Sequence, residues 1–220
     1  MADDLGWADV SWRDINMHTP TLHALAHNNA VLLNQAYVNQ LCSPTRSALM
    51  SGYDPYHIGT QHGVFYPMEP SGLPPDLVLF PSKLQKIGYK TYMVGKWHLG
   101  YCNDSYLPTY RGFDHFNGFY SGAQDYYSRS YLYDAQGYEV TGFDFWRQTN
   151  VDYSSVGEYS SETYARLASD YIRSHARDQP LFMYLAFQSV HFPLQVPAPY
   201  LEHCKQHRLE RRVYCGPLLV

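Results

Sequence analysis

The stretch Leu41–Gly52, read as LCSPTRSALMSG, constrains the fold more than any other. Pro44 lacks a backbone N–H and suits the first turn of a helix, and Gly52 suits the residue just past a helix end. The pattern predicts a helix of about two turns with Cys42 at its start. Helix N-termini attract anions, and Arg46 adds a planar fork of donors. The stretch therefore indicates a nucleophile beside an anion site, or alternatively a buried structural cysteine.

Two adjacent carboxylates, Asp3 and Asp4, open the chain just before Gly6. In a strand their side chains would point to opposite faces, so they converge on one cation only where the backbone turns. Carboxylate oxygens are the ligands that calcium prefers. The pair indicates a metal site at a strand end, with a solvated turn as the alternative reading.

Basic residues lie at the carboxyl ends of two further predicted strands. Lys90–Lys96 reads as a strand, and Lys96 and His98 share one face of an extended backbone, suited to holding an anion and moving a proton. The apolar run 181–187 is typical of a strand in a parallel sheet, and it leads into His191. Open α/β sheets carry their sites at the carboxyl ends of such strands.

Helical and strand patterns alternate along the chain, which predicts an α/β fold with a central, mostly parallel sheet flanked by helices. We expect a strand over 31–38 leading to Cys42, and a hairpin over Tyr131–Phe145. Helices are expected from Thr19-Pro20 with Leu22, Leu25 and Ala26 as the apolar stripe, over Asp76–Ile87, and over Ser160–His175.

Two motifs identify the chain as resembling the sulfatase family. Cys42-x-Pro44-x-Arg46, with its following apolar pair and glycine, is similar to the first sulfatase signature, with hydroxyl residues Thr45 and Ser51 as variants. Gly95–Gly100 (GKWHLG) is similar to the second signature, and 107–114 continues the likeness. The resemblance implies an alkaline-phosphatase-like fold that is truncated at both ends, since the first strand and the C-terminal half of family enzymes find no match.

The resemblance also implies the chemistry of sulfate-ester hydrolysis. Cys42 would be oxidised to Cα-formylglycine by the formylglycine-generating enzyme, and Ca²⁺ would be held by Asp3, Asp4 and residue 42. Arg46 and Lys96 would stabilise negative charge, and His98 would accept a proton. His191 would assist the leaving group, and Lys96 and His191 would contact the substrate. Strings such as 184–197 resemble the arylsulfatase B group, which implies sulfated glycosaminoglycans or aryl sulfates as substrates.

The likeness covers about residues 3–200, which we expect to be the N-terminal part of a sulfatase catalytic domain, with 201–220 as an irregular or divergent tail. Met1-Ala2-Asp3-Asp4 predicts no signal peptide, although family members are lysosomal or secreted and Asn103-Asp104-Ser105 is a glycosylation sequon. A catalytically inactive fragment and a related phosphoesterase are the alternative functions.

Composition excludes several classes of protein. A net charge of −4 argues against a nucleic-acid-binding protein, and no apolar run approaches the ~20 residues of a membrane span. The pairing of Cys102, Cys204 and Cys215 stays open. His57 and His62 are interpreted as surface residues. Many of the 22 tyrosines lie between 120 and 164, where they could stack on sugar rings or pack the hairpin.

Overall fold

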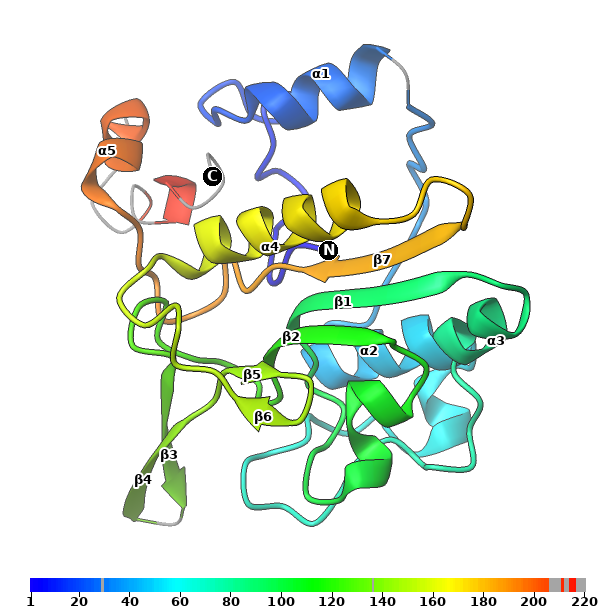
Figure 1. Ribbon diagram of the computed structural model, residues 1–220. Coiled ribbons are helices and arrows are strands. Elements are labelled where there is room, and N and C mark those ends of the chain that lie inside the picture. Colours follow the sequence, from blue (N-terminus) through cyan, green and yellow to red (C-terminus); the bar gives the residue numbers. More distant parts are fainter. Residues whose placement is uncertain (29, 136, 206–210, 212–213, 217–220) are drawn as a thin grey trace.

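The computed structural model describes residues 1–28, 30–135, 137–205, 211 and 214–216 (Figure 1). The helices are α1 Pro20–Asn28, α2 Cys42–Ser51, α3 Phe80–Lys86, α4 Ser160–Ser174 and α5 Ala198–Leu201, with 3-10 turns η1 Pro55–Ile58, η2 Asp104–Tyr106, η3 Pro108–Tyr110 and η4 Glu202–Cys204. The strands are β1 Lys90–Lys96, β2 His115–Phe119, β3 Ser130–Ala135, β4 Tyr138–Phe143, β5 Trp146–Arg147, β6 Asn150–Val151 and β7 Leu181–Ala186. Within these ranges, no helix combines the length and apolar character that crossing a membrane requires.

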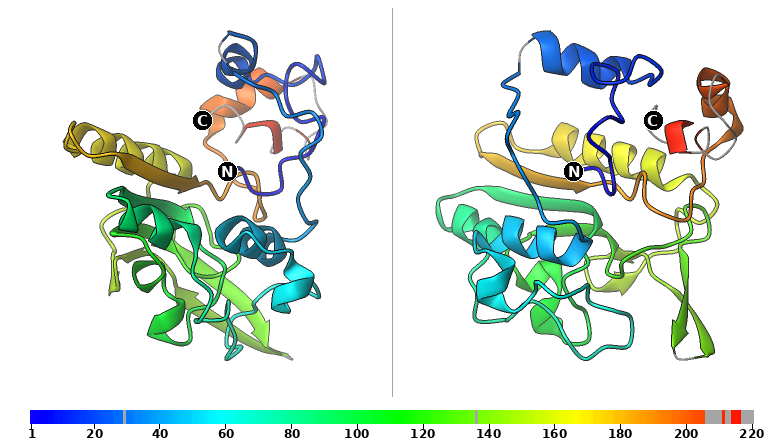
Figure 2. Two further views of the ribbon diagram at one scale, coloured as in Figure 1. Left: turned by 90° about the vertical axis from the view of Figure 1, so that its right-hand side faces the viewer. Right: turned by 180° about the vertical axis from the view of Figure 1, so that it is seen from behind.

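A mixed sheet lies at the centre of the molecule, in the order β6-β5-β2-β1-β7. β1 is parallel to both β2 and β7, whereas β5 is antiparallel to β2. Helix α4 covers one face of the sheet, and α2 and α3 lie on the other (Figures 1 and 2). The α/β class and the parallel centre predicted from the sequence are confirmed. β3 and β4 form a separate antiparallel hairpin, as expected, although Gln136 in its predicted turn lies outside the described residues.

Alternation along β1 divides the core into two apolar clusters. Met93 packs with Met50, Trp97 and Phe116 on the α2 side of the sheet, whereas the next residue, Val94, packs with Phe119, Phe145 and Tyr164 on the α4 side. Successive side chains of a strand point to opposite faces, so a strand covered by helices on both sides buries nearly every residue. β1 therefore ends with Lys96 fully buried.

The N-terminal residues run along the outer edge of β7. The Met1 amino group donates to the Leu185 carbonyl over 2.7 Å, and the Phe187 N–H donates to the Met1 carbonyl over 3.0 Å. The Asp3 N–H donates to Ser189 over 2.9 Å. These backbone bonds deliver the Asp3 side chain to the end of the sheet where β1 and β7 finish.

The prediction of a strand over 31–38 is wrong. These residues form no strand, and Val31, Leu33, Tyr37 and Val38 are largely exposed, because the chain crosses here from α1 to α2 without a strand beside it (Figure 1). Helix α1 forms where predicted, but none of its residues is buried, so its apolar stripe does not face the core.

The helix expected over Asp76–Ile87 begins later, at Phe80. Pro81 explains the difference, because proline is tolerated in the first turn of a helix but not in its interior. The expected elements over Lys90–Lys96, Ser160–His175 and 181–187 match β1, α4 and β7 within one residue at each end.

Candidate active site

Cys42 begins α2, as predicted. Pro44 lies buried in the first turn, and Gly52 ends the helix with φ of 76° while its N–H donates to Ala48 over 2.8 Å. The hydroxyl of Ser43 fixes this end of the helix, because it donates to the His98 carbonyl over 3.0 Å and accepts from the Phe65 N–H over 3.1 Å. The helix start is thereby joined to the segment that follows β1.

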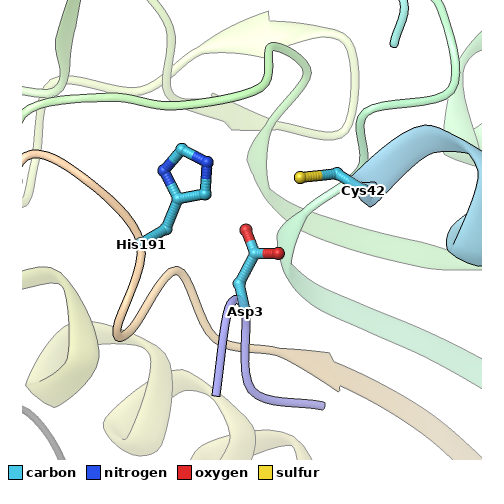
Figure 3. Close-up of side chains that lie close together, drawn as sticks. All are labelled: Asp3, Cys42 and His191. Carbon is cyan, nitrogen blue, oxygen red and sulfur yellow. The ribbon is translucent and has the colours of Figure 1, made fainter. Parts of the chain in front are cut away.

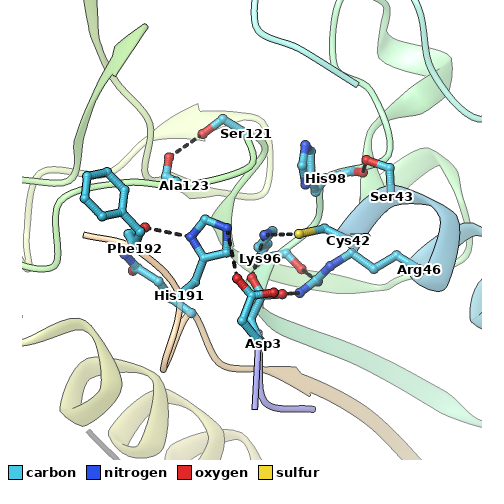
Figure 4. Close-up of polar contacts among 12 residues, drawn as sticks. Asp3, Cys42, Ser43, Arg46, Lys96, His98, Ser121, Ala123, His191 and Phe192 are labelled. Atoms are coloured by element: carbon cyan, nitrogen blue, oxygen red, sulfur yellow. Dashed lines mark hydrogen bonds and ion pairs between the residues drawn. The ribbon is translucent and has the colours of Figure 1, made fainter. Parts of the chain in front are cut away.

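Two buried cations and one buried carboxylate surround the Cys42 sulfur (Figure 4). Lys96 Nζ lies 2.5 Å from Asp3 Oδ2 and 3.2 Å from Cys42 Sγ. Arg46 Nη2 lies 3.4 Å from Asp3 Oδ1, and its Nη1 donates to the Lys96 carbonyl over 2.6 Å. With His191, these residues form what we call the Cys42 cluster. Two features require glycine at position 95. Its φ of 103° is one that residues with a side chain rarely adopt, and a Cβ there would lie 1.9 Å from the Ala186 carbonyl oxygen.

The charges of the cluster shift its pKa values in opposing directions. Burial alone would raise the pKa of Asp3, but the charges of Lys96 and Arg46 outweigh it and lower that pKa. Burial raises the pKa of the Cys42 thiol, against the opposing charge of Lys96. An unmodified Cys42 is therefore mainly a protonated thiol at neutral pH, which is a weak nucleophile.

His98 lies beside the cluster, but its ring makes no direct contact with Cys42 among the described contacts. Its Nε2 lies 3.0 Å from the Phe65 carbonyl, which can only accept, so Nε2 carries the proton. Burial, and then the charges of Lys96 and Arg46, hold the pKa of His98 well below its ordinary value. Nδ1 is buried without a hydrogen-bond partner among the described residues. His98 is thus a neutral imidazole with a free lone pair.

His191 approaches Cys42 from the turn after β7. Its Nδ1 lies 2.6 Å from the Phe192 carbonyl, which makes Nδ1 the donor and leaves Nε2 available. Nε2 lies 3.5 Å from the Oδ2 of Asp4, whose side chain is 55% exposed. Asp4 has φ of 62°, so the backbone does turn between the two aspartates.

The Cys42 cluster fits a cation in part. Ligand atoms of Asp3, Cys42 and His191 all lie within 4.8 Å of one another and point toward a common centre (Figure 3). Calcium takes about six to eight oxygen ligands and has little preference for sulfur or nitrogen. Among the described residues, this group offers calcium the carboxylate of Asp3, whereas the predicted ligand Asp4 lies outside the group, 3.5 Å from His191 Nε2.

The sequence reasoning missed the tyrosines that hold these groups. Tyr184 Oη lies 3.2 Å from Arg46 Nη1, and Tyr126 donates to the His191 carbonyl over 2.9 Å. A tyrosine hydroxyl leaves no local sequence pattern, because its partner lies far along the chain. Other predicted positions lie at the surface: Asn103, His57 and His62 are exposed. Cys204 pairs with Cys215, which leaves Cys42 and Cys102 free.

Curated relatives of the chain are sulfatases. It is 40% identical to arylsulfatase J of Mus musculus, over 99% of this chain and 36% of that protein. It is 29% identical to N-acetylgalactosamine-6-sulfatase of Homo sapiens, over 91% of this chain and 40% of that protein. The chain thus spans well under half the length of these relatives.

Solved structures share the fold. The crystal structure of Ps i-CgsB aligns with a TM-score of 0.82 and 25% identity, covering 99% of this chain and 50% of that one. BT4656 in complex with its substrate D-glucosamine-2-N,6-O-disulfate aligns with a TM-score of 0.65 and 24% identity, covering 91% and 35%. The profile of the Sulfatase family matches residues 1–214, and the chain belongs to that family.

Proposed function

We propose that the Cys42 cluster is the sulfate-binding half of a sulfuric-ester hydrolase site. The observation that carries this proposal is a charge imbalance, because two fully buried cations, Arg46 and Lys96, face a single buried carboxylate, Asp3. Buried charge without compensation is costly, so such a site favours an anion. Arg46 Nε is also buried without a hydrogen-bond partner among the described residues.

The chain's own residues have distinct tasks in this proposal. Arg46 and Lys96 stabilise the negative charge that spreads over the sulfate oxygens. His191, when both ring nitrogens carry a proton, donates the Nε2 proton to the leaving oxygen, and His98, through its free Nδ1, accepts a proton. The bond of His98 Nε2 to the Phe65 carbonyl leaves Nδ1 for this task.

Two added groups complete the proposed chemistry. Cα-formylglycine at position 42, made by the formylglycine-generating enzyme, would supply as its hydrate a hydroxyl that attacks sulfur and a second hydroxyl whose deprotonation releases sulfate. Calcium, held in part by Asp3 and Asp4 next to residue 42, would polarise the sulfate oxygens. The carboxylate of Asp3 that fits the metal is the same one that now pairs with Lys96.

We further propose sulfated glycosaminoglycans as the substrates, which the name of the N-acetylgalactosamine-6-sulfatase relative supports. A lysosomal or secreted location of the full-length protein agrees with this substrate, and glycosylation of the exposed Asn103 is proposed with it. A disulfide between Cys204 and Cys215 is also typical of proteins that mature outside the reducing cytosol.

The test combines peptide mass spectrometry with turnover of a chromogenic aryl sulfate. In protein from a formylglycine-competent secretory host, the peptide containing Cys42 should have the mass of formylglycine. Calcium-loaded protein should release the chromophore, and Cys42→Ala should abolish that release. Cys102→Ala is the matched control, because Cys102 is also a free cysteine but is exposed. Absence of turnover in modified, calcium-loaded protein would favour the inactive fragment instead.

A phosphate-ester substrate is the competing choice of anion. A phosphate monoester carries more negative charge than a sulfate ester at neutral pH, whereas the buried cluster has one cation in excess. We therefore expect the aryl sulfate to be hydrolysed faster than the matching aryl phosphate. Faster hydrolysis of the phosphate ester would replace the sulfatase proposal with the phosphoesterase alternative.

A further inference from the structure

We propose that an aromatic cavity at the root of the β3–β4 hairpin binds one neutral sugar ring of the substrate, next to the sulfated residue. Its link to catalysis rests on the proposed function, but the binding itself does not. The cavity has a volume of about 210 Å³. This suits a single ring, since pockets for drug-sized ligands measure about 300–1,000 Å³. The lining residues that matter here are Pro67, Tyr120, Tyr131, Tyr133, Gly142 and Asp144.

Two walls of this hairpin cavity are joined to His98. His98 Nε2 donates to the Phe65 carbonyl, and Pro67, two residues further along, lines the cavity. The His98 N–H donates to the Tyr120 carbonyl over 3.1 Å, and Tyr120 and Ser121 form another wall. Gly122, next to Ser121, lies against the His98 ring, since a Cβ on Gly122 would lie 2.6 Å from His98 Cε1. A substrate whose sulfate lies at Cys42 can therefore extend a neighbouring ring into the cavity.

The aromatic rings of the cavity offer flat apolar faces. Tyr131 and Tyr133 lie on the same face of β3, with ring centroids 6.5 Å apart and planes inclined by 25°. Opposite Tyr131 on β4 stands Gly142, where an added Cβ would meet no atom within 4 Å. The missing side chain leaves open space on β4 across from Tyr131, and the apolar face of a sugar ring can pack against such rings.

Asp144 supplies the polar recognition and selects against charged sugars. Its Oδ1 accepts from the Tyr120 N–H and the Trp146 Nε1–H, over 3.1 and 2.8 Å, and its Oδ2 accepts from the Ser121 N–H over 2.8 Å. A carboxylate has about four acceptor positions, so one remains for a sugar hydroxyl. The same charge repels the carboxylate of a hexuronic acid. The cavity therefore fits a neutral hexose or N-acetylhexosamine, and among the proposed glycosaminoglycan substrates it selects those with a neutral ring beside the sulfated residue.

The experiment titrates the 220-residue chain with the methyl glycosides of a neutral hexosamine and of a hexuronic acid, followed by NMR. We expect the neutral glycoside to bind at least fivefold more tightly. Gly142→Val should weaken that binding at least tenfold, because the new side chain fills the open space across from Tyr131 in the cavity lining. Thr141→Val is the matched control, since Thr141 lies on β4 opposite the exposed Leu132 and outside the cavity lining.

The outcome is read independently of turnover. Equal affinities of Gly142→Val and Thr141→Val for the neutral glycoside, with both variants folded by circular dichroism, would overturn the inference. Tighter binding of the hexuronic acid would overturn it as well. If the glycoside binds as expected while aryl sulfate turnover is absent, the proposed function fails and the sugar site stands. If the aryl sulfate is turned over but the glycoside does not bind, the sugar site fails and the proposed function stands.

Discussion

Of the two segments on either side of Cys42, the more apolar one in sequence, 30–41, is the less well packed. Residues 30–41, before the cysteine, are exposed throughout, with Leu33 73% exposed. In α2, which starts at the cysteine, seven of the ten residues are buried. The difference teaches that an apolar pattern becomes a regular element only where another element covers it, because most of the stability of such an element comes from packing.

Contacts with the end of β1 explain why α2 is well packed. Arg46 bonds to the Lys96 carbonyl, Ser43 bonds to the His98 carbonyl, and Met50 joins the core on that face of the sheet. The candidate site thus stands on the well-packed segment, and each contact that holds it there can be removed singly. Four substitutions, from the largest expected effect to the smallest, test the contrast between the two segments.

Arg46→Ala should have the largest effect. It removes a fully buried guanidinium and leaves Asp3 with Lys96 as its remaining ion-pair partner. Cutting back a large buried side chain to alanine typically costs about 2–5 kcal/mol through the cavity it leaves, and the Lys96 carbonyl also loses its donor. We expect a loss of that size in the free energy of unfolding, measured by urea denaturation. A loss below about 1 kcal/mol, within the range of exposed ion pairs, would mean that this part of α2 is far less well packed than the structure indicates.

Ser43→Ala should rank second. The Ser43 hydroxyl is buried, and its loss leaves the Phe65 N–H and the His98 carbonyl without this partner. An unsatisfied buried polar group costs about 1–3 kcal/mol. The same variant should reduce aryl sulfate turnover, because Phe65 also orients the His98 ring. Unchanged stability together with unchanged turnover would contradict the positioning role of Ser43.

The contrast also separates what the sequence could predict from what it could not. α2, β1, α4 and β7 were predictable, because local cues such as Pro44 and Gly52 agree with the burial those segments receive. The contact of Asp3 with Lys96 followed from placing strand ends at one edge, although the catalytic roles of these residues stay predictions. The prediction of a strand over 31–38 failed because the apolar residues there do not reveal whether another strand lies beside them. The support from Tyr126 and Tyr184 is equally invisible in local sequence.

Gly52→Ala should have a smaller effect on the C-terminal end of α2. Gly52 has φ of 76°, and a Cβ there would meet no atom within 4 Å, so the cost is conformational. A left-handed residue with a side chain costs about 1–2 kcal/mol, which thermal unfolding can resolve. Gly63→Ala is the matched control, because its added Cβ is equally free but its φ lies outside the left-handed range. Equal stabilities of the two variants would remove the helix-ending role assigned to Gly52.

Leu33→Ser should have the smallest effect, since it lies in the exposed segment before Cys42. Substitutions at exposed positions usually change stability by less than about 0.5 kcal/mol. We therefore expect an unfolding midpoint equal to that of the unsubstituted chain, and a protease specific for large apolar residues should cut within 30–41 before it cuts α2. A loss of 2 kcal/mol or more, or protection of 30–41 from cleavage, would show that another surface covers this segment in solution. The difference in packing between 30–41 and α2 would then hold only for the chain without that covering surface.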